Sequence, residues 1–435
     1  MAATNNTAVS ARSAPITERR FLVPFVLITS LFFLWAFGVN LNDILIPHLK
    51  KAFGLTDFQS SFIQVAFFGG YCLAAFPAGR LMEKIGYKRG ILVGLALCAA
   101  GALLFLPASS ARVYPFFLSA LFVMACGQSF LEVAANPYVT ILGPAESSER
   151  RLNFAQSFNA VGSVVAPAMG RAMILTGVEY TPAQLAAMSA AQVEAYRAAE
   201  AGTVRAPYLI IAGIFLFVAA LIYFAHLPEV RDEEEARQGA SAVSGDSVWK
   251  HGHLIKGAIA QFFYVGAQVG VASFVIRFAQ FTEPGTTAKA AALYVFLHQV
   301  GFMAGRFGGS FLMKLIPAAR LLAVFAASAV TLLIIAIAAT GMIPVWAVVL
   351  LGFFHSIMFP TIFALGIKNL GALTKRGSSM MVMAIIGGAL FPAIMGRISD
   401  ASSIQRAFIV PLICHAYILY FALSGYKPAA VRSAS

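Results

Sequence analysis

Charged side chains are scarce in this chain of 435 residues, since Asp, Glu, Lys and Arg make up only 11% of it. A soluble domain carries about 25% of such residues, so the shortage excludes an ordinary soluble protein. Hydrophobic residues reach 60%, including 38 Phe, and the mean hydropathy is +0.81. Apolar runs recur from Phe21 to about Gly425. The composition therefore predicts one membrane domain that accounts for nearly the whole chain.

Cysteine is also rare, and the usual signatures of enzymes are missing. All four cysteines (Cys72, Cys98, Cys126 and Cys414) lie inside apolar runs. There they are typical of small packing residues rather than of disulfides or paired metal ligands. The sequence contains no G-x-S-x-G, no H-E-x-x-H and no phosphate-binding glycine loop. We therefore expect no enzyme activity, no metal site and no cofactor.

Twelve apolar segments are long enough to cross a membrane, which takes about 20 residues. They cover residues 21–47, 58–82, 90–107, 113–142, 152–176, 207–227, 254–281, 289–313, 320–340, 344–370, 377–399 and 406–425. Because their number is even, both chain ends are expected on the same side of the membrane.

The basic residues indicate which side that is. The net charge is +13, but Lys and Arg do not cluster with aromatic residues, which argues against a nucleic-acid partner. If both ends are inside, the tails and inner loops hold 19 of the 31 Lys and Arg residues, and the outer loops and ends hold 9. The positive-inside rule therefore predicts cytoplasmic termini.

Polar stretches divide the chain into regions. We expect a cytoplasmic tail at 1–20, a six-helix bundle at 21–227, a cytoplasmic linker at 228–253, a second bundle at 254–425 and a cytoplasmic tail at 426–435. The linker is charged and rich in Ser and Gly, a composition that rarely folds alone. The outer segment 177–206 predicts a short surface helix with a Thr-Pro start.

Weak internal similarity indicates that the two bundles are repeats. When the chain is shifted by 225 residues, Arg151 matches Arg376, and a glycine and a proline follow each of them at equal distances. The shared order predicts an all-α membrane protein with twelve transmembrane helices in two pseudo-symmetric six-helix bundles. The stretch "PYVTILG" from Pro137 matches "PTIFALG" from Pro360 at a shift of 223 residues, which places Glu132 opposite His355. The shift of 225 residues places Gln156 opposite Met381 and Asn159 opposite Ala384, so the first half keeps more polar groups.

Amides and carboxylates interrupt the apolar spans of the first half. Asn40 and Asp43 are three residues apart, as are Gln156 and Asn159, so each pair shares one helix face. Amides that converge on a central cavity suit a ligand rich in hydroxyls, because an amide both donates and accepts hydrogen bonds. The predicted substrate-binding residues are Trp35, Asn40, Glu132, Gln156, Asn159, Gln268 and Arg306.

Other interpretations of these residues remain open. A single amide in a membrane helix often bonds another helix instead of a ligand. Asp43 lies near a span end that water can reach, whereas Glu132 is in the middle of its span. Three roles remain open for Arg306: it forms an ion pair with a carboxylate, it binds sugar hydroxyls, or its side chain extends to the membrane interface. The glycines 301, 305 and 309 around it predict close helix packing.

The two carboxylates suggest proton coupling. A carboxyl in a cavity that opens alternately to each side is neutral when occluded and ionised when wet, so it loads a proton outside and releases it inside. We therefore assign Asp43 and Glu132 to proton coupling. Segment 79–90, "GRLMEKIGYKRG", carries charges and glycines that latch the inner helix ends in one state, or it simply supplies positive-inside charge.

Several stretches resemble the fucose:proton symporter family of the major facilitator superfamily: "FFLWAFGVNLND", "FLEVAANPYVTILGP", "RLNFAQSFNAVG" and "PTIFALGIKNLG". The resemblance implies a twelve-helix importer in a bacterial inner membrane, with Asp43 and Glu132 as its functional carboxylates. It also implies that Asn40, Gln156 and Asn159 are polar cavity positions. Ala272 and Phe359 depart from the family pattern, which has a tryptophan and a tyrosine there.

The sequence therefore predicts proton-coupled import of a monosaccharide, L-fucose, by alternating access. Alternatives are import of glucose, galactose or N-acetylglucosamine, which other members of the family carry, an uncoupled facilitator, and a membrane sensor that binds sugar without moving it. The expected partners are a sugar and the lipid bilayer, and we expect a monomer.

Overall fold

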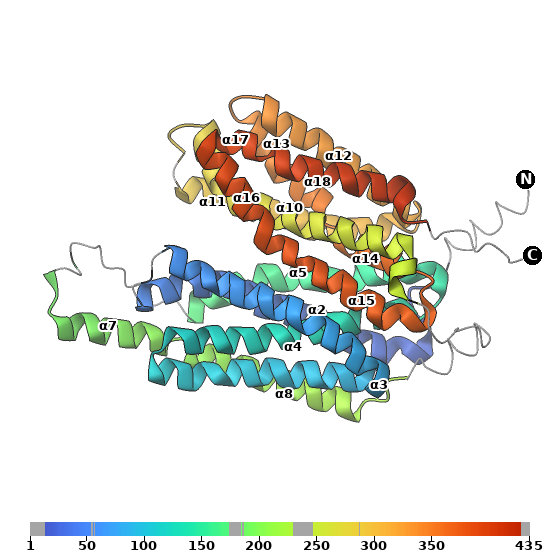
Figure 1. The fold of residues 1–435 in the computed structure, drawn as a ribbon, viewed down its shortest axis with the longest axis horizontal. Helices are drawn as coiled ribbons and strands as arrows, with labels where there is room; N and C mark the ends of the chain where they lie inside the picture. Colours follow the sequence, from blue (N-terminus) through green and yellow to red (C-terminus); the bar gives the residue numbers. More distant parts are fainter. Residues whose placement is uncertain are drawn as a thin grey trace, which may run out of the picture.

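The computed structural model describes residues 14–53, 55, 57–173, 184, 187–228, 247–286 and 288–427. Within them, every regular element is a helix. The helices form two bundles, one above the other in Figure 1. The bundles lie close together at the right-hand end of this view and further apart at the left-hand end. This is the predicted all-α architecture.

The first bundle contains six α-helices and two short 3-10 turns. They are η1 (Arg19–Phe21), α2 (Leu22–Phe53), α3 (Asp57–Ala111), α4 (Tyr114–Ile141), η2 (Ala145–Ser147), α5 (Ser148–Met173), α7 (Ala190–Gly202) and α8 (Arg205–Phe224). The predicted surface helix of the outer segment corresponds to α7. Its first turn is capped by Ser189, whose side chain accepts a hydrogen bond from the Gln192 amide. The Thr-Pro pair at 181–182 lies outside the described residues.

The second bundle is more interrupted. It contains η3 (Val248–Lys250), α10 (Gly252–Thr282), α11 (Ala288–Leu312), α12 (Ala318–Ala338), α13 (Ile343–His355), α14 (Met358–Ile367), η4 (Gly371–Leu373), α15 (Thr374–Met383), η5 (Ala384–Ile386), α16 (Gly387–Ala401), α17 (Ile404–Ala407), α18 (Ile409–Tyr420) and the π-turn η6 (Phe421–Gly425). Most of the expected linker, residues 229–246, lies outside the described residues.

All twelve predicted spans lie on helices. The second and third are joined in α3, where Gly86 turns the chain with φ of +82°, a conformation that suits glycine. Nine segments of the described residues are long and apolar enough to cross a membrane. One of the nine contains both spans of α3, and α5 and α11, which carry several charged or amide side chains, are not among them.

Proline explains two breaks in the second bundle. A proline lacks an N–H and clashes with the carbonyl four residues before it. The predicted span 344–370 is divided between α13 and α14 at Ser356, four residues before Pro360. The last span is divided between α17 and α18 just after Ala407, four residues before Pro411. The apolar runs alone predict two continuous helices at these positions.

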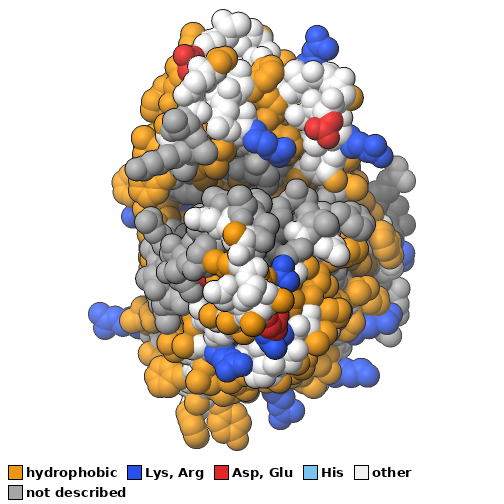
Figure 2. All heavy atoms as spheres, turned by 90° about the vertical axis from the view of Figure 1, so that its left-hand side faces the viewer, with side chains coloured by type: hydrophobic (Ala, Val, Ile, Leu, Met, Phe, Trp, Pro, Cys, Tyr) orange, Lys and Arg blue, Asp and Glu red, His pale blue; other side chains and the backbone are white. Residues whose placement is uncertain are grey.

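Large apolar side chains cover the flanks of the protein. Phe224 is 83% exposed, and Leu73, Phe217 and Ile343 are more than 60% exposed. In the end-on view of Figure 2, hydrophobic side chains surround the outside of both bundles, and the charged ones are scattered. A continuous apolar belt of this kind is expected where helices face lipid.

Close glycine contacts bring helices of the second bundle together. A Cβ placed on Gly305 would lie 2.5 Å from the Phe353 carbonyl oxygen, and one on Gly309 would lie 2.2 Å from the Ile357 side chain. Gly301 also faces Phe353. The three glycines therefore pack α11 against the end of α13, as their spacing predicts.

Candidate functional site

A hydrogen-bonded chain of polar side chains joins the two bundles within the apolar interior. Arg306 on α11 donates to the Gln156 side-chain oxygen at 2.8 Å and to its backbone carbonyl at 2.9 Å. The Gln156 amide nitrogen on α5 donates to the Asn136 oxygen on α4 at 2.9 Å. All three side chains are at most 3% exposed. Arg306 therefore neither snorkels to an interface nor pairs with a carboxylate within the described residues.

Glu132 lies one helical turn from Asn136 and is also buried. Its side chain is 1% exposed, and neither carboxylate oxygen makes a hydrogen bond. The Asn136 amide nitrogen also has no hydrogen-bond partner, so no hydrogen bond joins the two side chains. An ionised carboxylate without a partner is costly at such a position, so the protonated form suits this arrangement.

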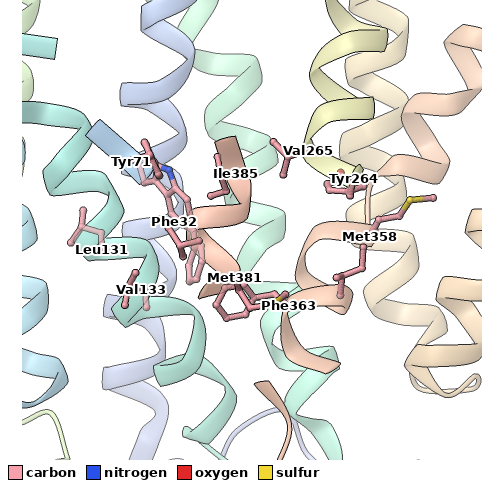
Figure 3. Packing of buried hydrophobic residues seen from close by; sticks show 14 of the residues in the cluster. Phe32, Tyr71, Leu131, Val133, Tyr264, Val265, Met358, Phe363, Met381 and Ile385 are labelled. Atoms are coloured by element: carbon pink, nitrogen blue, oxygen red, sulfur yellow. The ribbon is translucent and has the colours of Figure 1, made fainter. Parts of the chain in front are cut away.

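Aromatic residues flank this polar group on the side of α2 and α3. The Trp35 indole packs on Phe32, with ring centroids 5.7 Å apart, and Tyr71 packs on Phe67 at 5.2 Å. Figure 3 shows Phe32 and Tyr71 of the first bundle on one side of the interior, with Met381 and Ile385 of the second bundle opposite them. Both bundles contribute to one continuous apolar cluster.

The other predicted site residues have different surroundings. Asn40 donates to the carbonyl of Ala36 on its own helix at 2.7 Å. Asn159 and Gln268 are half-buried and make no hydrogen bond within the described residues. Asp43 lies on α2, and its side chain is outside the described part of the structure. Their roles in binding and coupling stay predictions.

The two departures from the family pattern lie on the second bundle. Phe359 packs against Tyr264 at 6.3 Å and against Phe363 at 6.3 Å between ring centroids. Ala272 is half-buried on α10. The wall that these residues contribute is therefore apolar, without the hydroxyl and the indole of the family pattern.

Three buried histidines gather where the second bundle matches the position of Glu132. The ring of His355 stacks on His415 with centroids 4.9 Å apart, and His298 lies 5.9 Å away. His298 and His415 each bond a backbone carbonyl through Nδ1, whereas both nitrogens of His355 have no partner. Among the described residues, no group of His, Cys, Asp and Glu has the geometry to hold a metal ion.

Two ion pairs join the bundles at the end where the bundles lie close together. Lys368 contacts Glu149 at 2.6 Å, and Arg376 contacts Glu83 at 2.5 Å. The hydrogen bond that Arg376 donates to Glu83, together with the negative charge of that carboxylate, raises the pKa of the Arg376 guanidinium above its ordinary value. The loop 79–90 therefore does link the two halves, as its charges suggested. Between these pairs and the buried site, Asn153 donates to Thr361 at 3.1 Å.

The repeat partners Arg151 and Arg376 are used differently. Arg151 is fully buried and donates to carbonyls at the end of α4 and to Ile16 of the N-terminal segment. Its neighbour Arg150 bonds the Ala14 carbonyl at 2.5 Å. Arg376 instead reaches across to the first bundle. The arginine at this repeat position therefore stabilises the first bundle internally in one half, and it connects the two bundles in the other half.

Sequence reasoning missed two residues at the site. Tyr71 on α3 donates to the Gln128 side-chain oxygen at 3.2 Å, and both are buried. Gln128 lies four residues before Glu132 on α4, so helical spacing from the carboxylate was a signal that pointed to it. Tyr71 lies in another span, and its sequence position carried no such signal.

This arrangement offers amide donors, a carboxylate and a guanidinium inside an apolar shell, at the meeting of two bundles. Such a group binds a small polar molecule with many hydroxyls. Because the halves meet through separable contacts, their relative movement would open the group to one side or the other.

Comparisons with known proteins agree with this architecture. Residues 28–394 match the family model described as Major Facilitator Superfamily. A glucose/galactose transporter of Brucella abortus is 45% identical, covering 92% of this chain and 93% of the relative. The L-fucose-proton symporter of Escherichia coli is 44% identical, covering 93% of each.

A solved structure extends the agreement to three dimensions. The crystal structure of the transporter FucP in the outward conformation matches with a TM-score of 0.85 at 43% identity, over 93% of this chain and 99% of that one. The resemblance noted in the sequence is confirmed, and the relatives are transporters and not enzymes. The chain belongs to the major facilitator superfamily, in the group that contains the L-fucose-proton symporter and the glucose/galactose transporters.

Proposed function

We propose that this protein imports a monosaccharide together with protons by alternating access, and that the sugar is L-fucose. The observation that carries the proposal is the buried chain from Arg306 through Gln156 to Asn136, with Glu132 beside it. It presents donors and acceptors from both halves at one point of an apolar interior. Relatives at 44–45% identity that are named as sugar transporters support the same function.

Proton coupling follows from the unpaired state of Glu132. Its buried carboxyl has no cation and no hydrogen bond in the described residues, so crossing an occluded state requires that the group is protonated. We assign the coupled proton to Asp43 and Glu132 together, and protons are the only coupling ion that we propose. No cofactor enters the cycle.

We further propose the arrangement of the protein in the membrane. The tails 1–20 and 426–435 and the linker 228–253 lie in the cytoplasm, and the bundles 21–227 and 254–425 span a bacterial inner membrane as a monomer. The excess of Lys and Arg in the inner loops supports this orientation. The ion pairs of Glu83 and Glu149 then close the cytoplasmic end.

Radiolabelled uptake tests the proposal directly. Purified protein in vesicles with an imposed inward pH gradient should accumulate L-fucose above the outside concentration. Dissipating the gradient should abolish accumulation while leaving exchange of labelled for unlabelled sugar. Uptake at the same rate and to the same level with and without the pH gradient would indicate an uncoupled facilitator. Specific sugar binding without uptake would indicate a sensor.

A second candidate substrate has specific support. Ala272 and Phe359 replace the aromatic and hydroxyl groups of the fucose pattern, and the glucose/galactose transporter is as similar to this chain as the fucose symporter is. The same vesicles should therefore be tested with D-glucose and D-galactose. Accumulation of either in preference to L-fucose would assign the hexose as the substrate.

A further inference from the structure

Three polar side chains lie in a row along α4. Gln128, Glu132 and Asn136 are four residues apart, so they share one helix face and rise by about 6 Å at each step. Each is at most 1% exposed. Each also has at least one atom without a hydrogen bond: Nε2 of Gln128, both oxygens of Glu132 and Nδ2 of Asn136.

The hydrogen bonds around the row decide which amide atom is free. Arg306 can only donate, so the Gln156 atom that it contacts must be the oxygen. The Gln156 nitrogen then donates to Asn136, whose accepting atom must be its oxygen. The Asn136 NH2 group is therefore left as an unused donor beside Glu132.

The other end of the row is arranged in the same way. The Tyr71 hydroxyl bonds the Gln128 oxygen at 3.2 Å, which leaves the Gln128 NH2 group unused. The row thus presents a donor, a carboxylate and a second donor. Buried polar groups are almost always paired in folded proteins, so three unpaired neighbours indicate a missing partner.

A hydroxyl group can pair with the unbonded amide donors and carboxylate oxygens of this row. It accepts one hydrogen bond from an amide and donates one to a carboxylate oxygen. When Glu132 is ionised, two hydroxyls on adjacent carbons would donate to its two oxygens while accepting from Gln128 and Asn136. When Glu132 is protonated, one of these hydroxyls accepts from the carboxyl O–H instead. An ammonium group only donates hydrogen bonds and a carboxylate only accepts them, so neither can satisfy both kinds of neighbour at once.

We propose that Gln128, Glu132 and Asn136 bind a pair of adjacent hydroxyls of the substrate. Gln128 is then a specificity-determining residue, and Tyr71 is a positioning residue that holds its amide. The inference rests on the proposed sugar transport and deepens it, because it states which feature of the sugar is recognised.

Deoxy sugars test the proposal in the full-length protein reconstituted in vesicles. Inhibition of L-fucose counterflow is measured with L-fucose and with its derivatives lacking the hydroxyl at C2, C3 or C4. Two derivatives that lack neighbouring hydroxyls should each bind about tenfold to hundredfold more weakly than L-fucose. If the protein transports D-galactose instead, the same series of galactose derivatives is used.

The variant Gln128→Met removes the amide with little change in shape. Its affinity for L-fucose should fall at least tenfold. One of the two sensitive deoxy sugars lacks the hydroxyl that Gln128 binds, so the variant should bind this sugar about as tightly as the wild-type protein does, as in a double-mutant cycle. Gln128→Asn, which keeps a shorter amide, should show a smaller loss with the same deoxy sugar. Ser119→Ala is the matched control, because Ser119 lies on the same helix and bonds the backbone carbonyl of Pro115 and not the row; its preference among the sugars should not change.

The outcomes separate this inference from the proposed function. A wild-type protein that transports none of the sugars overturns both. Sugar transport with no pair of adjacent sensitive positions overturns the inference alone. Equal loss of affinity for every sugar in Gln128→Met would also overturn it and would leave the row as a site filled by water.

Discussion

Arg306 shows how one cation is accommodated inside a membrane-spanning bundle. Its guanidinium gives two hydrogen bonds to Gln156 and lies over the Phe302 ring at 4.8 Å. Both contacts offset part of the cost of removing a charge from water. Because Gln156 belongs to the other half, the same contacts tie the position of Arg306 to the relative placement of the bundles.

Two amides on α5 should respond differently to truncation. Gln156→Ala strands Arg306 and the Asn136 oxygen, so it should lower both the stability of the protein and its sugar affinity by about 1–3 kcal/mol. Asn159 has no hydrogen bond in the described residues, so Asn159→Ala should weaken sugar binding by a similar amount with a change in stability of about 0.5 kcal/mol or less. Thermal unfolding and sugar titration of both purified variants measure the difference. Unchanged sugar affinity in Asn159→Ala would show that Asn159 contributes to helix packing and not to sugar binding.

Asp43 and Glu132 are expected to differ in the transport cycle. Asp43→Asn holds that site neutral, which mimics the protonated form allowed to cross the occluded state. Exchange of labelled for unlabelled sugar should therefore persist while uphill accumulation disappears. Glu132→Ala should impair both, because Glu132 lies beside the amides that we propose to bind the sugar. Counterflow and gradient-driven uptake are compared for the two variants, and normal accumulation by Asp43→Asn would remove Asp43 from the mechanism.

At the scale of elements, hydropathy and loop charge predicted the helices well, because crossing a membrane imposes length and apolarity on each span. The breaks in spans ten and twelve were missed, although Pro360 and Pro411 mark them. A proline inside a membrane helix is compatible with either a kink or a continuous helix, so sequence alone did not choose between them. The α3 junction at Gly86 had a clear sequence signal in its charged, glycine-containing loop.

The three histidines on α11, α13 and α18 give a prediction about helix packing. His355 is fully buried with both ring nitrogens unpaired, which costs free energy that a leucine of similar volume would not incur. His355→Leu should therefore leave the protein equally stable or more stable, with sugar transport intact. Thermal unfolding and uptake of this variant provide the measurement. Lost transport at unchanged stability would show that His355 takes part in the cycle.

At the scale of the whole molecule, the internal repeat predicted two bundles but not what each half does with its matched positions. Gln156 and Asn159 were recognised because amides are conspicuous in an apolar run. Gln128 and Tyr71 were not, since their role depends on how α3 packs on α4. The ion pairs between halves were only partly foreseen: the loop 79–90 was suspected as a latch, but no local pattern joined it to Arg376.

Those ion pairs should set the balance between the two states of the transporter. Glu83 with Arg376 and Glu149 with Lys368 join the bundles at one end, the end that we place in the cytoplasm. Removing them weakens the state in which that end is closed, and each partly exposed pair contributes about 0.2–1 kcal/mol. Replacing Glu83 and Glu149 by Gln together should therefore favour opening there by about twofold to thirtyfold.

Hydrogen exchange of α15 and of segment 79–90 measures that opening in the purified protein. The exchange rates should rise in the double variant. They should return toward the wild-type values when the charges of one pair are swapped, as in Glu83→Arg with Arg376→Glu. Glu194→Gln is the matched control, because Glu194 pairs with Arg112 within the first bundle and makes no contact with the second in the described residues. An equal rise in the control, or none in the double variant, would mean that the apolar contacts between the bundles alone hold this end closed.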